Sequence, residues 1–374
     1  MNENLIKTQC QGNNMGKVDP RKKSSVDPFG ESSIQDYENL FKEFGIKSIE
    51  PLLKKIKNPH MFMRRGIDFG HRDLDKFLAS KNRAVMSGIK PTGEFHLGSK
   101  MIAEKMIYFQ QEFKTKVFYS VADIEAYEDN GTPLEQSAKI AIDNVADTLA
   151  LGLDPKNAYI YKQSTELRVQ KMAFLFAPKI TTNTFKAVYG ERKIGLYMAA
   201  LLQSGDILMP EMEVGYTSTL VPIGVDQDPH MRLTRDIAAK FNLPLPCSIY
   251  NKFFRALDGS AKMSKRNPMG YLTLNDSPEI VKKKVMSTLT GGRDTLVEQK
   301  RLGGRPDKCM IYELMYFHFE QDDKKLKEFY NKCKSGELTC GECKKMNLDK
   351  IISFYNKHQL KKKKMIPKAK KILE

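Results

Sequence analysis

The chain has 374 residues, 41% of them hydrophobic, which is enough for one large core or two smaller ones and excludes a wholly disordered protein. Its 62 Lys and Arg residues against 45 Asp and Glu give a net charge of +17, which favours a polyanionic partner over generic solubility. No apolar run approaches the ~18 residues that cross a bilayer, and residues 1–20 lack the apolar stretch of a secretory signal. We therefore expect a cytoplasmic protein that does not enter membranes and keeps its six cysteines reduced.

Residues 1–82 are expected to form an N-terminal extension. Residues 1–25 are polar and basic and end in RKKSS, which indicates an arm that is mobile or becomes ordered on a partner. From 32 to 82, apolar side chains such as Leu40 and Leu52 recur at helical spacing, so we expect helices there.

From residue 83 onward, short strands alternate with helices. The expected strands are the apolar runs 84–88, 117–123, 157–161 and 217–225. Between them, helices are expected over 101–113, from Pro133 to a C-terminal Gly152, and over 231–241. This alternation predicts an α/β fold, a Rossmann-type doubly wound parallel sheet whose ligands bind at the carboxyl ends of the strands.

Two regions depart from the alternation. Residues 165–215 are expected to form a helical insertion between the two halves of the sheet. After a strand-like FFRAL at 253–257, only helical patterns rich in Lys and Glu remain, and they end in LKKKKMIPKAKKILE. We therefore predict a catalytic domain over 83–270 and a C-terminal all-helical domain with a basic tail over 271–374.

The sequence PTGEFHLGSK, residues 91–100, lies between an expected strand and an expected helix. The N-terminus of a helix presents unpaired N–H groups and the positive end of its dipole, which is where phosphates bind. His96 lies at the mouth of this loop, and Gly98 lets a nucleotide approach the backbone because it has no side chain. Alone, the pattern fits a loop histidine without a catalytic role equally well.

A second candidate site is AKMSKRNP, residues 261–268. Lys262 and Lys265 can reach successive phosphates from a loop and stabilise the negative charge of a leaving pyrophosphate. Alone, the pattern fits a solvated turn. Together, in this order and about 165 residues apart, the two motifs resemble the paired signatures of the class I aminoacyl-tRNA synthetases.

A longer resemblance, over about residues 26 to 350, is to the archaeal and eukaryotic branch of the tryptophanyl-tRNA synthetases. It rests on four stretches: VDPF at 26–29, MFMRRGIDFGHRDLDKFL at 61–78, IGVDQDPHMRLTRD at 223–236 and TGGRDT at 290–295. The sister tyrosyl family lacks the DQDP and GGRDT blocks, which makes it the lesser alternative. The resemblance implies that VDPF closes over ATP as the N-terminal arm becomes ordered.

The resemblance also assigns roles to individual residues. It implies that His96, Ser99, Lys262 and Lys265 act in catalysis. It implies that ATP, with Mg²⁺ on its phosphates, is bound by Gly88, Pro91, His96, Gly98, Gly224, Asp226, Met263 and Ser264. It implies that L-tryptophan is bound by Met86, Glu125 and Gln227. A carboxylate at Glu125 suits an indole N–H or an ammonium group. The alternative is that Glu125 is an exposed carboxylate on a surface helix and has no role in binding.

Three positions depart from the family pattern. Ser99 replaces the final histidine of the first signature, and Arg266 replaces the final serine of the second. Met86 stands where many eukaryotic relatives have a tyrosine that lines the amino-acid pocket. Loss of one transition-state donor costs ~2–4 kcal/mol unless another group compensates.

Four cysteines near the C-terminus, Cys309, Cys333, Cys340 and Cys343, are spaced C-x23-C-x6-C-x2-C. Two cysteines three apart can hold one metal centre across a turn, and two more can complete the set. The spacing is similar to that of some bacterial tryptophanyl enzymes with a 4Fe-4S cluster, which implies such a cluster, with zinc as the lesser option. The alternative is four unrelated thiols.

The family resemblance further implies a homodimer, and tRNA(Trp) as the polyanionic partner. Two other functions stay open on the sequence. A small-molecule nucleotidyltransferase could use the same loop, but it would have little use for about 100 basic helical residues after the second motif. A catalytically silent synthetase paralogue that binds RNA is favoured by Ser99. It is opposed by six intact residues of the family motifs: Gly98, Asp226, Gln227, Lys262, Ser264 and Lys265.

Overall fold

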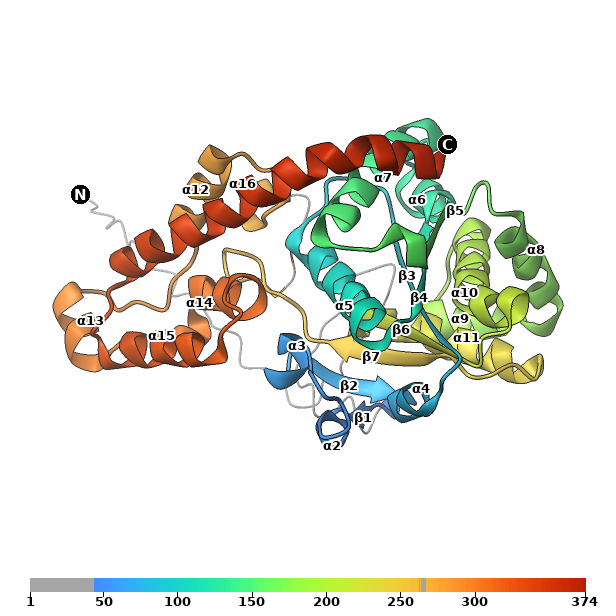
Figure 1. The fold of residues 1–374 in the computed structure, drawn as a ribbon, viewed down its shortest axis with the longest axis horizontal. Coiled ribbons are helices and arrows are strands. Elements are labelled where there is room, and N and C mark those ends of the chain that lie inside the picture. Colours follow the sequence, from blue (N-terminus) through green and yellow to red (C-terminus); the bar gives the residue numbers. More distant parts are fainter. Residues whose placement is uncertain (1–43, 262, 264–266) are drawn as a thin grey trace, which may run out of the picture.

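A seven-stranded sheet, in the order β1-β2-β7-β6-β3-β4-β5, lies at the centre of the computed structural model, which describes residues 44–261, 263 and 267–374 (Figure 1). The strands are β1 (Lys47–Ser48), β2 (Asp68–Arg72), β3 (Arg83–Ile89), β4 (Lys116–Val121), β5 (Ala158–Lys162), β6 (Ser218–Gly224) and β7 (Cys247–Asn251). VDPF, Lys262, Ser264, Lys265 and Arg266 lie outside the described residues.

The helices around the sheet are α2 (Glu50–Leu53), α3 (Met61–Arg64), α4 (Leu74–Ala79), α5 (Leu97–Phe113), α6 (Asp123–Asn130), α7 (Leu134–Leu151), α8 (Leu167–Phe176), α9 (Thr182–Tyr189), α10 (Ile194–Val214) and α11 (Asp228–Lys240). The C-terminal helices are α12 (Pro278–Ser287), α13 (Leu296–Leu302), α14 (Met310–Leu314), a π-helical segment at Met315–Phe319, α15 (Asp323–Ser335) and α16 (Cys340–Leu373).

The five strands β7, β6, β3, β4 and β5 are parallel, which confirms the doubly wound fold. The chain runs from β3 outward through β4 to β5, and then returns to place β6 on the other side of β3. At this reversal the connections leave β3 and β6 in opposite directions, so a crevice opens at the carboxyl ends of the two strands.

Helices cover both faces of the sheet because side chains alternate along each strand. In β3, Val85 packs with α4, α5, α7 and the end of α16, whereas Ala84 and Met86 pack with α8, α10 and α11. Helices α8, α9 and α10 occupy the segment between β5 and β6, which confirms the helical insertion expected over 165–215.

Local sequence sets the ends of the helices next to the crevice. The side chain of His96 caps α5, since its Nδ1 accepts a hydrogen bond from the backbone N–H of Ser99 at 3.2 Å. Pro133 precedes α7, and Gly152 ends it with a φ of 120°, as its position in the sequence predicted.

The helical expectation for 32–82 is wrong over part of its described length. Strand β2 pairs antiparallel with β7, and β1 extends the same edge. The reason is tertiary: Asp68 is buried in β2 against Lys105 of α5, at 3.2 Å, and Arg72 meets Asp228 of α11 at 2.9 Å. The expectation of a strand at 253–257 is also wrong. Strand β7 precedes this stretch and ends at Asn251.

The C-terminal helix α16 runs from the C-terminal helices back across α7 (Figure 1). Thr339 and Glu342 form a capping box at its start, and its last turns bury Ala369 and Leu373 in the core beside the sheet. Two buried contacts hold it to Asp147 of α7: His358 Nε2 at 2.7 Å and Lys362 Nζ at 2.8 Å.

No helix of the described residues is both long and apolar enough to span a membrane. The boundaries at 82/83 and 270/271 stay predictions.

Candidate active site

Two cavities meet at the crevice between β3 and β6. Cavity A, of about 250 Å³, lies among the carboxyl ends of β3, β4 and β6 and the helices α10 and α11. Cavity B, of about 390 Å³, lies between the loop before α5 and the segment around Met263 and Tyr271. The two cavities share Ile89 and Lys90 as lining residues, so they lie next to each other just beyond the end of β3.

Cavity B contains the first signature motif. His96 and Ser99 both line it, and Ser99 Oγ lies 3.5 Å from His96 Nε2. At Gly98, a Cβ atom would lie 2.9 Å from His96 Cε1 and 3.1 Å from Met263 Cε. A side chain there would crowd the His96 ring and press on the end of Met263, so the glycine leaves room for the close approach of the α5 N-terminus and Met263.

Cavity A has a buried carboxylate at one wall. Asp206, on α10, accepts hydrogen bonds from Tyr161 Oη at 2.7 Å and from Gln163 Nε2 at 2.6 Å. Burial raises the pKa of Asp206 to about 7, although these two donors oppose the rise. Carboxyl oxygens are hydrogen-bond acceptors, so Asp206 can accept a hydrogen bond from a buried N–H group of a ligand.

A charged cluster lies where cavity A approaches cavity B. Lys90 Nζ is 2.5 Å from Asp129 Oδ2 and 3.3 Å from Glu125 Oε1, both on α6. Burial lowers the pKa of Lys90, but the two carboxylates outweigh this and the net pKa is raised. Burial raises the pKa of Glu125, and Lys90 opposes that shift. The cluster therefore offers a cation beside an anion to a ligand in cavity A.

A buried histidine lies at another wall of cavity A. His230 of α11 lies 2.9 Å, at Nδ1, from Tyr189 Oη. Burial, helped by the charge of Lys90, lowers the pKa of His230 to about 3, so the imidazole is neutral at physiological pH.

The predicted site residues divide between the two cavities. Cavity A is lined by Met86, Gly88, Glu125, Gly224 and Gln227, and cavity B by His96, Ser99 and Met263. Pro91, Gly98 and Asp226 line neither cavity. Asp226 is nevertheless adjacent, because a Cβ atom at Gly224 would lie 2.6 Å from its Oδ1.

Lining residues of cavity A that were not predicted from the sequence include Lys90, Gln203, Asp206 and His230. The sequence context of one of them, Asp206, could have identified it as a functional residue. Asp206 is the one acidic residue in the apolar stretch IGLYMAALLQSGDILM, and an acid in such a stretch is buried at a cost unless it has a role or a partner. The sequence around Lys90 gave no indication of its position in the site, because a lysine beside a proline in a loop is typical of the protein surface.

The four C-terminal cysteines come together at α14, α15 and α16. Burial, and the proximity of Cys309 and Cys340, raise the pKa of Cys333 to about 11. A Cβ atom at Gly304 would lie 2.7 Å from Cys333 Sγ, and one at Gly292 would lie 3.1 Å from Cys340 Sγ. Within the described residues, however, no three His, Cys, Asp or Glu side chains are placed to hold a metal ion. The described arrangement of these thiols therefore gives no evidence for zinc or for an iron–sulfur cluster.

Comparisons with known proteins extend over nearly the whole chain. Residues 79–356 match the family described as tRNA synthetases class I (W and Y). A tryptophan–tRNA ligase of Aeropyrum pernix is 40% identical in an alignment that covers 93% of this chain and 98% of that protein. A tryptophan–tRNA ligase of Methanopyrus kandleri is 43% identical in an alignment that covers 86% of this chain and 89% of that protein.

Solved structures agree with these sequence matches. The crystal structure of tryptophanyl-tRNA synthetase from Aeropyrum pernix superposes with a TM-score of 0.87 at 39% identity, over 93% of this chain and 99% of that one. The tryptophanyl-tRNA synthetase of Plasmodium falciparum superposes with a TM-score of 0.82 at 30% identity, over 90% and 94% of the two chains.

Proposed function

Because the chain belongs to the tryptophan–tRNA ligases of the class I synthetase family, we propose that cavity A binds L-tryptophan and cavity B binds ATP. The enzyme activates tryptophan with ATP and transfers it to tRNA(Trp). One observation carries the assignment of the cavities: they share Ile89 and Lys90, so a carboxylate in one can meet an α-phosphate in the other.

In cavity A, the proposed ligand contacts follow from the chemistry of the walls. Met86 and Ile207 supply apolar surface for the indole ring. Asp206 faces the cavity as an acceptor for the indole N–H, and Glu125 is a partner for the substrate ammonium group. Since Met86 carries no hydroxyl, recognition of the N–H passes to the Asp206, Tyr161 and Gln163 group.

In cavity B, the N-terminus of α5 is the proposed phosphate site. His96 and Ser99 line the cavity at this helix end, where free N–H groups and the helix dipole favour anions. Lys262, Ser264 and Lys265 are proposed to meet the same phosphates from the second motif. Bound Mg²⁺ supplies further neutralisation of the phosphate charge.

The adenylation step needs no nucleophilic side chain. A carboxylate oxygen of tryptophan forms a bond to the α-phosphorus of ATP, and the bond from that phosphorus to the bridging oxygen breaks. The electron pair leaves with pyrophosphate, and no proton moves. The protein therefore aligns the two reactants and stabilises charge, which the lining of the two cavities suits.

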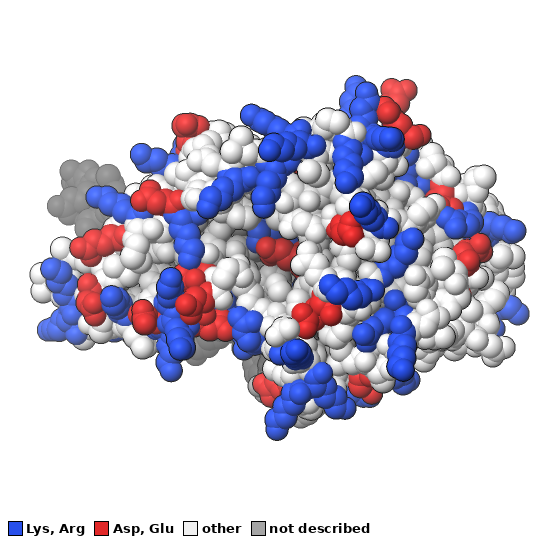
Figure 2. Space-filling view, viewed as in Figure 1, with Lys and Arg blue, Asp and Glu red and all other residues white. Residues whose placement is uncertain are grey.

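The proposed tRNA surface includes α16. Exposed lysines follow one another along its second half, at Lys361, Lys363, Lys364, Lys368, Lys370 and Lys371. Figure 2 shows blue side chains gathered over the region that α16 crosses in Figure 1. Such a row fits the phosphates of a nucleic acid, and each neutralised phosphate releases counterions.

A homodimer is proposed on the insertion helices. Leu167 is 73% exposed, Phe174 70% and Ile194 80%, and all three belong to α8 or the start of α10. Exposed apolar side chains that gather into one patch mark interaction surfaces, and we propose that these three belong to one. A second copy of this chain is the proposed occupant, and the molar mass in solution tests it.

A 4Fe-4S cluster remains a proposal for Cys309, Cys333, Cys340 and Cys343. It is supported by the mutual proximity of the thiols and by Gly292 and Gly304, which leave room beside two of them. Cys thiolates are the usual ligands of such a cluster, and these four would hold it. Protein purified without oxygen should be brown and contain iron; colourless, iron-free protein would leave four ordinary thiols.

The experiment for the main proposal is amino-acid-dependent exchange of labelled pyrophosphate into ATP. Exchange with tryptophan alone supports the assignment. Exchange with tyrosine would instead assign cavity A to tyrosine, and no exchange with any amino acid would favour a silent RNA-binding paralogue.

A further inference from the structure

We propose that Lys90 is a further catalytic residue, whose ammonium group contacts the tryptophan carboxylate where that carboxylate attacks the α-phosphate of ATP. This inference rests on the proposed function, since it requires that cavity A holds tryptophan and cavity B holds ATP.

The position of Lys90 in the fold is the first observation. It directly follows β3, the strand beside which the sheet reverses its winding, and it lines both cavities. Ile89 lines both cavities as well, but it is apolar and cannot stabilise charge. Within the described part of the chain, Lys90 is thus the charged side chain at the junction, where the two reactants must meet.

The fixed orientation of its ammonium group is the second observation. Asp129 Oδ2 at 2.5 Å and Glu125 Oε1 at 3.3 Å, both from α6, hold Lys90 Nζ. An ammonium group has three donors, so two carboxylates leave at least one donor for a ligand. The side chain is 27% exposed, which is compatible with a donor directed into the cavities.

Charge complementarity is the third observation. Tryptophan is a zwitterion whose ammonium and carboxylate groups lie on one carbon atom. The cluster presents the opposite pair, the anionic Glu125 beside the cationic Lys90, at one end of cavity A. When the ammonium group of tryptophan binds Glu125, the carboxylate of tryptophan lies next to Lys90 and is directed at cavity B.

The role in the reaction follows from the charges. As the carboxylate oxygen bonds to the α-phosphorus and the bond to the bridging oxygen breaks, negative charge builds up around that phosphorus. Lys90 keeps its proton throughout and stabilises this charge, while it also relieves repulsion between the carboxylate and the phosphate. The pair of carboxylates on α6 keeps the ammonium protonated and in place.

The test uses the absence of tryptophan from the chain, because indole fluorescence then reports the ligand alone. Binding of tryptophan and of tryptamine, which lacks the carboxylate, is measured for the full-length wild type and for Lys90→Met. We expect the preference of the wild type for tryptophan over tryptamine to shrink about tenfold in the variant, with tryptamine bound no more weakly than by the wild type. The kcat of pyrophosphate exchange should fall about 100-fold and recover in part in Lys90→Arg.

The controls separate this role from a structural one. If Lys90 only orders α6, Lys90→Met should weaken the binding of tryptophan and of tryptamine by the same factor. That result would overturn the proposal. Lys350 pairs with Glu320 at the same distance of 2.5 Å, and neither residue lines cavity A or cavity B, so Lys350→Met should leave exchange unchanged. A wild type without tryptophan-dependent exchange would refute the proposed function itself, whereas an active wild type with an equally active Lys90→Met refutes only the role of Lys90.

Discussion

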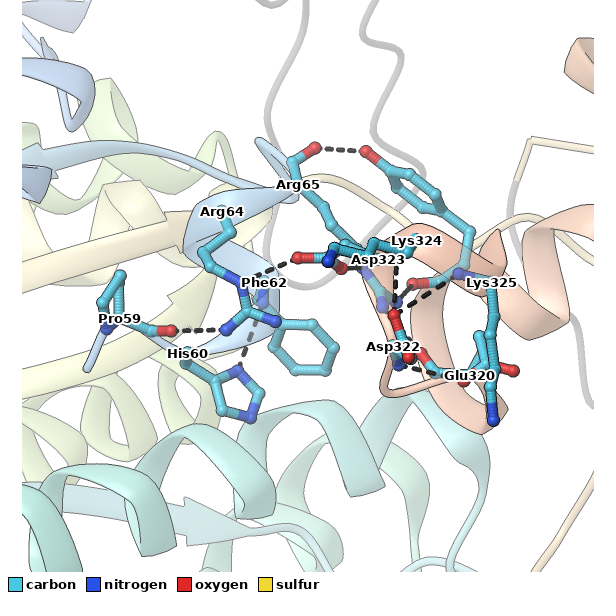
Figure 3. Close-up of polar contacts among 11 residues, drawn as sticks. Pro59, His60, Phe62, Arg64, Arg65, Glu320, Asp322, Asp323, Lys324 and Lys325 are labelled. Carbon is cyan, nitrogen blue, oxygen red and sulfur yellow. Dashed lines mark hydrogen bonds and ion pairs between the residues drawn. The ribbon is translucent and has the colours of Figure 1, made fainter. Parts of the chain in front are cut away.

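Arg65 Nε donates to Asp323 Oδ1 at 2.7 Å, which joins two residues that lie 258 positions apart in the chain (Figure 3). The same guanidinium donates to the backbone carbonyls of Tyr316, at 2.5 Å, and Glu320, at 2.7 Å, and the Tyr316 hydroxyl donates to the Arg65 carbonyl. Arg64 shares Asp323 through Oδ2 at 2.8 Å. This cluster attaches the segment after α3 to the π-helical segment and α15.

Arg65→Met should destabilise the protein by about 2 kcal/mol, because it removes the guanidinium donor from the partly buried carbonyl oxygens of Tyr316 and Glu320. Arg64→Met is the matched control. Its side chain is 40% exposed and binds the same carboxylate, so its loss should cost less than about 1 kcal/mol. Urea unfolding of both variants measures the difference, and equal losses would show that the buried carbonyl contacts do not matter.

The raised pKa of Asp206 predicts a pH dependence of stability. Its pKa is about 7 in the folded protein and 3.8 as the ordinary value, so the folded state holds the proton more tightly. Stability from this group is therefore present below about pH 4 and is lost as the pH rises to about 7. Compared with wild type, Asp206→Asn should lose less stability between pH 5 and pH 8 in urea unfolding.

Glu211 provides the control for that experiment. Burial raises its pKa to about 8, yet it does not line cavity A. Glu211→Gln should change the pH dependence of stability in the same direction as Asp206→Asn. Only Asp206→Asn should weaken tryptophan binding, by about tenfold, through loss of a charged acceptor. Equal tryptophan affinities in the two variants would contradict the indole-binding role of Asp206.

Replacement of His96 and of Ser99 by alanine should affect stability differently, although both should lower kcat. His96→Ala removes the α5 cap as well as a cavity B side chain, so it should lower stability by about 1 kcal/mol and kcat of exchange by about 100-fold. Ser99→Ala keeps the backbone N–H that the cap uses and should lower kcat with almost no loss of stability. Thermal unfolding and exchange kinetics separate the two effects. Unchanged kcat in Ser99→Ala would show that its hydroxyl does not contact the phosphates.

The lysines of α16 should act on tRNA and not on adenylation. Replacing Lys363, Lys364 and Lys368 by Gln should weaken tRNA(Trp) binding and lower the slope of log K against log salt by about 1 for each phosphate that the variant no longer neutralises. Pyrophosphate exchange should not change. Replacement of the exposed Lys54, Lys55 and Lys57 near α2 is the matched control for net charge. An equal loss in both triple variants would indicate a general charge effect without a specific surface.

The sequence by itself determined the alternating strands and helices, both ends of α7, the helical insertion and the family. These features depend on neighbouring residues: periodic apolar side chains, Pro133 before a helix, Gly152 after it, and motifs such as the one around His96. Local patterns of this kind are set by backbone geometry, which is why they could be predicted before any tertiary contact was known.

Only the tertiary structure decided which distant residues share a site. Strand β2 was expected to be helical from the spacing of apolar side chains. It is a strand because Asp68 is buried against Lys105 of α5 and Arg72 is paired with Asp228 of α11. Likewise, Lys90 reaches the junction of the two cavities only because the sheet reverses its winding at β3, and α6 brings Glu125 and Asp129 to it. Burial and long-range ion pairs depend on the packing of whole elements, and no short stretch of sequence contains that information.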